Sequence, residues 1–223
     1  MKTLRSLKVL ALLLLMSLAF GWVGGGCASS SGSSSAPKPG SGIAEYREVT
    51  REAHRSVAAT VKSLESLAQP PAQPLLQHPA LPGFDRAFHQ LELTSVKVRS
   101  RAEAIIMRGQ AYFDEWKGNV SAITNQAVAR AETEKYGRLL EHFDRVRQQS
   151  GEVREEFRSY MANLREFRAR LDRPANAAGG ESSAQNLDGM TARGRRVVKA
   201  LETIETTLSA AEAEVHATLA TKK

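Results

Sequence analysis

The apolar residues of this chain recur at alternating spacings of three and four along four separate segments. Such spacing places them on one face of a helix, and no segment shows the two-residue alternation of a half-buried strand. The pattern predicts helices at about Ile43–Ala68, Phe84–Ala122, Asn125–Asp172 and Asp188–Ala220. Each helix would bury one stripe, meaning the row of apolar residues along one face, and the connections between the helices would reverse the chain. This favours an all-α fold. We expect an elongated, antiparallel four-helix bundle with coiled-coil-like packing.

The third segment has the most regular repeat. From Tyr136 to Leu171 its stripe keeps the three-four spacing over about five heptads, which is typical of helices that wind around each other. At about 1.5 Å per residue, the third helix would reach about 70 Å and the first only about 40 Å. We therefore expect the second and third helices to form a long central hairpin, part of which only two or three helices cover.

The register of this hairpin follows from the position of its turn. A turn at Thr124-Asn125 would place Gly109 opposite Leu139 and Ile105 opposite Phe143. Small residues in the second stripe would then receive bulky side chains from the third helix; they are Ser95, Ala102 and Gly109. At the far end of the third helix, the second helix would be too short to cover the stripe. A scaffold would hide Phe157, Phe167 and Leu171 there under the first and fourth helices or under a partner protein, whereas a membrane-surface module would present them, together with Arg165, Arg168 and Arg170, to lipid.

The first 27 residues combine basic residues, an apolar run and a cysteine. The run Val9–Val23 follows Lys2, Arg5 and Lys8, and three glycines join it to Cys27, the only cysteine. It is shorter than the about 20 residues that a transmembrane helix needs. An ordinary secretory signal would leave Cys27 as an unpaired thiol in an oxidising compartment. The segment predicts a lipoprotein signal peptide, residues 1–26, cut before a Cys27 that carries a lipid anchor with palmitate. Plain secretion and an uncleaved membrane anchor are the alternatives.

The residues after the cysteine indicate how the anchor joins the folded part. Residues 27–42 are rich in Gly, Ser and Pro and predict a flexible linker, followed by a helical domain over residues 43–220. Ala28, rather than an aspartate, follows Cys27. By resemblance to lipoprotein sorting in bacteria with two membranes, this favours the outer membrane, with the body facing the periplasm, over the inner membrane.

Composition argues against several classes of partner and chemistry. The formal net charge is +7, but three of the basic residues lie in the signal, and acids and bases alternate along the rest. This favours a solvated surface and predicts no nucleic-acid binding. With Cys27 lipidated, no cysteine is left for a disulfide or a thiolate metal site. We expect no cofactor.

The remaining chemical groups do not form a recognisable catalytic or metal-binding pattern. Asp114 and Glu115 are adjacent on a helix and point about 100° apart, so they cannot share one substrate face. No histidine pair has the i,i+4 spacing of a helical metal site. Two acid–histidine pairs, Asp85–His89 and Glu212–His216, have no third ligand and favour surface ion pairing. We therefore predict no catalytic residue and no metal ligand.

Two basic clusters are the candidate contacts to anionic lipid headgroups or to an acidic partner. The alternative is a solvated face without a ligand. The first cluster, on the second helix, is Lys97, Arg99 and Arg101, and the second, at the start of the fourth helix, is Arg193, Arg195, Arg196 and Lys199.

Several short motifs resemble an uncharacterised bacterial family. They are Arg101-Ala-Glu, Tyr112-Phe-Asp-Glu-Trp-Lys117, Thr124-Asn125, the arginine-rich helix that follows, and Asn186-Leu187. By these, the chain resembles the family catalogued as domain of unknown function 2959, over about residues 45–217. The resemblance implies an exported helical protein and supplies no activity. The Pro-rich segment 69–83 departs from the family pattern.

These observations predict a non-enzymatic envelope lipoprotein that scaffolds or binds an envelope protein. The alternative is a helical module that binds or senses a membrane surface. The sequence leaves open the identity of the partner and whether copies of the chain assemble with one another.

Overall fold

The computed structural model describes residues 39–69, 75–171 and 181–220. The predicted signal peptide, Cys27 and most of the predicted linker lie outside these residues. The stretch Pro37–Lys223 forms a compact unit of its own, and the account below concerns this helical body.

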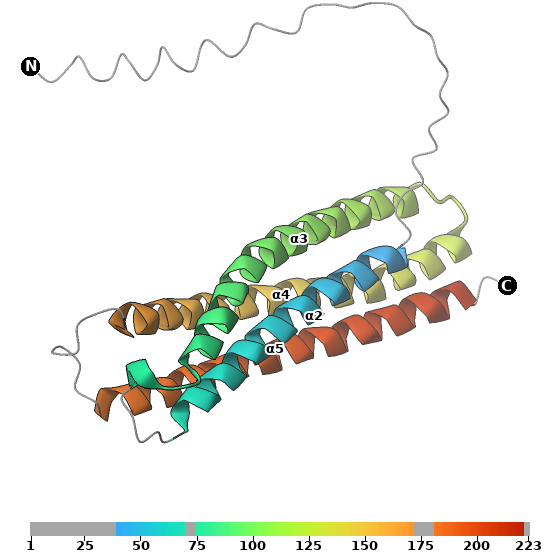
Figure 1. Ribbon diagram of the computed structural model, residues 1–223. Coiled ribbons are helices and arrows are strands. Elements are labelled where there is room, and N and C mark those ends of the chain that lie inside the picture. Colours follow the sequence, from blue (N-terminus) through green and yellow to red (C-terminus); the bar gives the residue numbers. More distant parts are fainter. Residues whose placement is uncertain (1–38, 70–74, 172–180, 221–223) are drawn as a thin grey trace, which may run out of the picture. The chain divides into compact units, whose positions relative to one another are not determined.

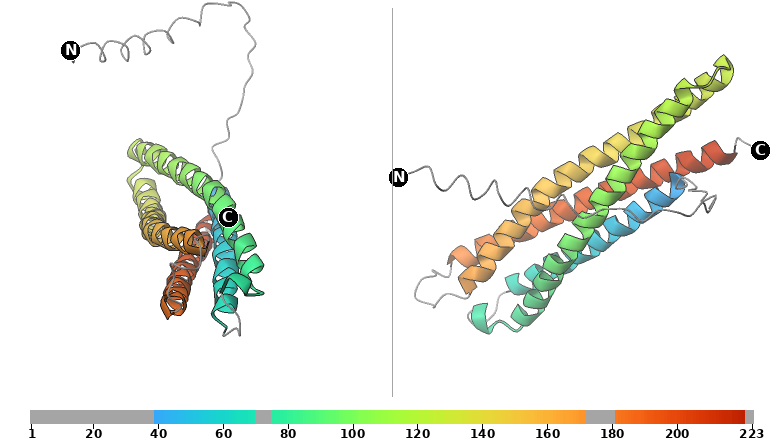
Figure 2. Two further views of the ribbon diagram at one scale, coloured as in Figure 1. Left: turned by 60° about the vertical axis from the view of Figure 1, so that its left-hand side comes forward. Right: turned by 90° about the horizontal axis from the view of Figure 1, so that it is seen from above.

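Within the described residues the body is all helical and contains the four expected helices (Figure 1). They are α2 (Pro39–Ala68), α3 (Leu81–Ser121), α4 (Gln126–Leu171) and α5 (Glu181–Ala220), with a short 3-10 turn, η1, at Leu75–Gln77. Successive helices reverse direction, which confirms the antiparallel four-helix bundle. The start of α2, the turn between α3 and α4 and the end of α5 lie at one end, here called the hairpin end (Figure 2).

Three helix starts differ from the prediction. Helix α3 begins at Leu81, three residues before the predicted Phe84, and takes Pro82 and Gly83 of the predicted break into its first turn. Residues 39–42 continue α2 rather than the linker, since proline is accepted at the first position of a helix. Helix α5 starts at Glu181, seven residues before the predicted Asp188, in a polar stretch without apolar periodicity. The start of α4 agrees with the prediction, because the Oδ1 atom of Asn125 accepts hydrogen bonds from the backbone N–H groups of Ala127 and Val128 at 3.0 and 3.2 Å.

The four helices pack around a square, but one side of the square is looser than the others. Helix α2 packs along α3 and α5, and α4 packs along α5, whereas α3 and α4 approach each other less closely. Long arginine side chains bridge this wider gap: Arg165 to Glu92 at 2.9 Å, and Arg154 to Glu103 at 3.8 Å. The predicted central hairpin is therefore present, but its two arms are spread.

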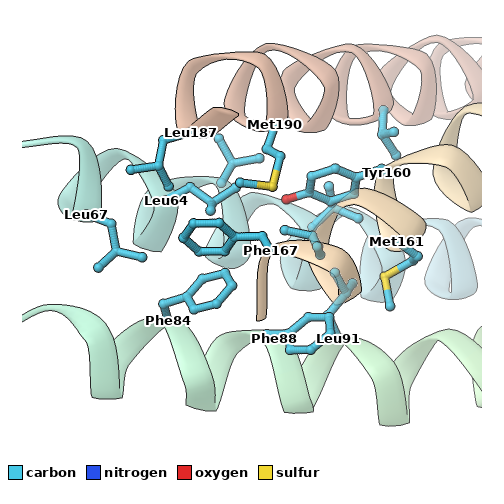
Figure 3. Packing of buried hydrophobic residues seen from close by; sticks show 14 of the residues in the cluster. Leu64, Leu67, Phe84, Phe88, Leu91, Tyr160, Met161, Phe167, Leu187 and Met190 are labelled. Carbon is cyan, nitrogen blue, oxygen red and sulfur yellow. The ribbon is translucent and has the colours of Figure 1, made fainter. Parts of the chain in front are cut away.

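The largest core cluster lies at the end opposite the hairpin turn (Figure 3). Phe84 of α3 and Phe167 of α4 meet edge to face there, with ring centroids 5.5 Å apart. Phe167 is only 6% exposed, and Phe157 and Leu171 pack against the same cluster. This end is therefore covered, as expected of a scaffold rather than of a membrane-surface module, because Phe84 near the start of α3 reaches Phe167, while α2 and α5 cover the other sides.

The register of the hairpin also differs from the prediction. A Cβ atom placed on Gly109 would lie 2.5 Å from the Phe143 ring, so Phe143, and not Leu139, is the nearest side chain to Gly109. Ile105 belongs to the same buried cluster as Val146. Relative to the prediction, the two helices are thus displaced along each other by about one helical turn.

Candidate binding pocket

An apolar pocket of about 150 Å³ lies at the hairpin end, between all four helices. Helices α3 and α4 approach each other less closely than the other neighbouring helices do, and the four apolar faces leave a space between them here. Most of its lining is aliphatic or aromatic. The apolar side chains come from α2 (Ile43, Tyr46), α3 (Ile105, Ile106, Tyr112, Phe113), α4 (Leu139, Phe143, Val146) and α5 (Leu208, Ala211, Val215).

An aromatic cluster borders the pocket toward the hairpin turn. The Phe113 and Phe143 rings, both in the lining, have centroids 5.1 Å apart. Beyond them, Trp116 and Tyr136 meet edge to face at 5.6 Å, and Phe113 also contacts Tyr136 at 5.9 Å. These contacts join α3 to α4, and Ile43 of α2 packs against the same cluster.

Two tyrosines in the lining keep their hydroxyls neutral. The Tyr46 hydroxyl shares a 2.6 Å hydrogen bond with the Ser150 hydroxyl, and burial raises the pKa of Tyr46. Burial also raises the pKa of Tyr112, and the nearby carboxylates of Glu115 and Glu132 act in the same direction. Neither phenol supplies an anion near neutral pH, so the interior of the pocket is apolar and uncharged.

Charged groups lie only in part of the lining. Arg108 of α3 pairs with Glu45 of α2 at 2.7 Å. Arg147 of α4 is about half exposed and pairs with Asp144 of the same helix at 3.0 Å. The Nδ1 atom of His142, also in the lining, is buried and has no hydrogen-bond partner among the described residues. The lining thus holds more hydrogen-bond donors than carboxylates.

Three of the four acidic residues considered as catalytic or metal-binding candidates have other partners. Asp85 pairs with Arg168 at 2.8 Å and Glu212 with Arg47, rather than with the neighbouring histidines. Asp114 accepts a hydrogen bond from Gln110 at 3.1 Å. Across residues 39–69, 75–171 and 181–220, no three His, Cys, Asp or Glu side chains come together as a metal site.

The first basic cluster joins two helices. Lys97 and Arg101 both contact Glu52 of α2, at 3.0 and 2.9 Å. The third member, Arg99, is exposed and makes no ion pair with any part of the chain that the structure describes. Two of the three predicted contacts are therefore held against α2, where the single carboxylate of Glu52 balances one of their two charges.

The second basic cluster also connects helices. Arg195 of α5 pairs with Glu65 of α2 at 2.6 Å, and Arg196 of α5 pairs with Glu156 of α4 at 2.9 Å. Arg193 lies 3.8 Å from the same Glu156, and Lys199 is exposed. The two clusters lie on different helices and do not combine into one site with the pocket.

The arginines near the end of α4 are likewise paired. Arg165 and Arg168 bridge to α3, through Glu92 and Asp85, and Arg170 pairs with Glu166 in its own helix. Because the aromatic residues between them are covered, this end does not present a joint basic and apolar face. None of the helices in the described ranges is both long and apolar enough to cross a membrane.

Sequence reasoning did not find the pocket. It identified Gly109 as a small residue that receives a side chain from α4. The spacing of apolar residues does not show, however, whether the apolar faces of two helices fill the space between them. In the structure, four aromatic residues of the two facing helices stay half-buried, which shows that the apolar faces of α3 and α4 do not cover each other fully; they are Tyr112, Trp116, Tyr136 and Phe143. The spacing of apolar residues along the sequence does not predict this partial exposure.

Comparisons of this chain with protein-family models, with curated proteins and with solved structures found no match.

Proposed function

We propose that this chain is a non-enzymatic lipoprotein of the cell envelope, whose helical body faces the periplasm and acts by binding. The observation that carries the binding role is the apolar pocket built jointly by α2, α3, α4 and α5. A concave, apolar site with a few polar groups is the usual form of a binding site for a small molecule or for part of a partner.

The anchor in this proposal is supported by the sequence of residues 1–28. An apolar run, three glycines and a single Cys27 fit lipidation of that cysteine, and Ala28 favours the outer membrane over the inner one. Because α2 starts at the hairpin end, the linker joins the body at the same end as the pocket. A bound ligand or envelope partner would therefore be held close to the point where the anchored chain enters the body.

The alternative role, a module that binds the membrane surface, has less support. It needs an uncovered apolar stripe beside unpaired basic residues. Phe167 is buried, and Arg165, Arg168 and Arg170 have carboxylate partners. Stable surface binding requires more apolar area and basic density than this end offers.

Labelling of cells with palmitate tests the anchor. The wild-type protein should take up the label and stay with membranes after a carbonate wash, whereas Cys27→Ala should lose the label and appear as an unprocessed or soluble form. Wild-type protein without label, together with a Cys27→Ala variant that still fractionates with washed membranes, would contradict the lipoprotein proposal.

Crosslinking in intact cells tests the binding role. We expect a discrete crosslinked product between the wild type and an envelope protein, reduced for Cys27→Ala because the variant is no longer held at the membrane. Crosslinks that are equally strong for both forms would count against a role that depends on the anchor.

A further inference from the structure

We propose that the pocket at the hairpin end binds the hydrocarbon tail of a single-chain anionic amphiphile, with the charged head beside Arg147 and His142. This inference rests on the proposed binding function and names the chemical class of the ligand.

The lining of the pocket indicates a hydrocarbon. Its interior side chains are aliphatic and aromatic, and its two tyrosines remain neutral. A polar ligand would lose its hydrogen bonds to water without replacement, whereas a hydrocarbon gains by leaving water.

The size of the pocket limits the ligand to one chain. A volume of about 150 Å³ matches that of an engineered apolar protein cavity that binds benzene, so about six carbon atoms fit inside. The rest of a longer chain would extend through the opening. A second acyl chain has no room, which disfavours a two-chain lipid.

The charges in the lining favour an anionic head. Glu45 is already paired with Arg108, so these two groups compensate each other. Arg147 keeps further N–H donors besides those facing Asp144 and Gln110, because a guanidinium has five. A head group that bonds to Nδ1 of His142 would also satisfy a buried atom that has no partner within the described residues. A carboxylate can accept from both, whereas a quaternary ammonium head cannot accept or donate.

The test is a calorimetric titration of the unit Pro37–Lys223 with dodecanoate below its critical micelle concentration. Every residue of the three core clusters lies inside this unit, so it keeps the complete bundle. We expect saturable binding of one dodecanoate per chain, with the fatty acid recovered unchanged. Absence of binding by the wild type would overturn the proposal.

Two matched variants on α3 test the place of binding. Ile106→Trp fills the pocket and should weaken binding by at least about tenfold, since loss of space for even one methylene changes affinity strongly. Ala104→Trp adds the same ring at an exposed position outside the lining and should leave binding unchanged. Circular dichroism checks that both variants are folded, and equal binding by the two would contradict the assignment.

Two further variants on α4 test the head group. Arg147→Gln should weaken dodecanoate binding, whereas Arg145→Gln, at an exposed position paired with Glu141 outside the lining, should not. Dodecyltrimethylammonium, which has the same chain and the opposite charge, should bind more weakly than dodecanoate. Equal affinity for the two amphiphiles would refute an anionic head.

Vesicles of phosphatidylglycerol distinguish a soluble amphiphile from a bilayer lipid. The isolated unit should not sediment with them at physiological salt. Sedimentation that Ile106→Trp abolishes would replace the proposed ligand by a membrane lipid. The outcome is separable from that of the proposed function, because palmitate labelling depends on Cys27 and dodecanoate binding is measured on a unit that lacks it.

Discussion

The ring of Phe143 in α4 occupies the space in which a side chain on Gly109 of α3 would stand. A Cβ atom at position 109 would lie 2.5 Å from Cε2 of Phe143, closer than such atoms come in folded proteins. Gly109 thus lets an aromatic ring approach the α3 backbone beside the pocket, and it defines the axial register of the α3–α4 hairpin.

Replacement of this glycine by leucine should destabilise the body. Gly109→Leu would push Phe143 aside, and overpacking of this kind costs about 1–3 kcal/mol. Urea unfolding of the isolated unit measures the loss. Gly118→Leu on the same helix is the control, because nothing lies within 4 Å of its added Cβ atom. Similar stability of the two variants would show that the hairpin has another register.

A second close approach joins α5 to two other helices. A Cβ atom on Gly194 would lie 2.5 Å from Val61 of α2 and 3.0 Å from the Tyr160 ring of α4. Because valine is stiff and Tyr160 is fully buried, neither side chain has room to move. We expect Gly194→Ala to cost about 1–3 kcal/mol, partly offset by the better helix propensity of alanine.

The matched control for Gly194→Ala lies on the same helix. Gly189 is exposed and has nothing within 4 Å of an added Cβ atom, so Gly189→Ala should stabilise the body by up to about 1 kcal/mol. Thermal unfolding of both variants shows whether the signs are opposite. A stabilising effect of both substitutions would rule out the tight contact at Gly194.

The buried phenol of Tyr160 should make the body sensitive to alkali. Burial raises the pKa of Tyr160 far above its ordinary value of 10.0. The unfolded chain ionises this group as the pH rises through about 10, while the folded chain does not, so stability is intact below that pH and falls above it. At pH 11 the loss from this residue is about 1 kcal/mol.

Tyr160→Phe removes this sensitivity. Its hydroxyl is buried and has no hydrogen-bond partner among the described residues, so the variant should be at least as stable as the wild type at pH 8. Urea unfolding at pH 8 and pH 11 should show a smaller loss for the variant. An equal loss in both proteins would mean that Tyr160 ionises in the folded state.

The carboxylate of Glu156 should make a small contribution to the stability of the body, through ion pairs with two arginines of α5. Both Arg196 and Arg193 approach Oε1 of Glu156, at 2.9 and 3.8 Å, and the glutamate side chain is 33% exposed. We expect Glu156→Gln to cost less than about 1 kcal/mol, and the cost to shrink in high salt. Glu155→Gln, whose partner Arg158 lies in the same helix and is more exposed, should cost less. A larger effect of Glu155→Gln would contradict the interhelical role of this arginine cluster.

The contact between Phe84 and Phe167 should contribute more to the free energy of unfolding than any of these ion pairs does. Phe167→Ala removes a buried ring from the largest cluster and should cost about 3–5 kcal/mol in unfolding experiments. Leu93→Ala changes a side chain that is 58% exposed on α3 and should cost far less. A small effect of Phe167→Ala would indicate that the end of α4 is uncovered.

The sequence by itself determined the class of the fold and most helix ends. The reason is that both depend on local interactions: a three-four apolar repeat forms one buried stripe, and Asn125 caps α4 from its own side chain. The same local logic missed the first residues of α2, α3 and α5, where Gly, Ser and Pro dominate or apolar markers are absent.

Only the tertiary structure decided how the stripes meet. The axial and angular placement of one helix against another decides three outcomes. It decides whether Gly109 faces Leu139 or Phe143, and whether Phe167 is covered. It also decides whether Lys97 and Arg101 meet a ligand or Glu52. That placement follows from the sum of many packing contacts among residues far apart in the chain. The pocket follows from the same cause, because residues of four helices line it together and no single helix carries its pattern.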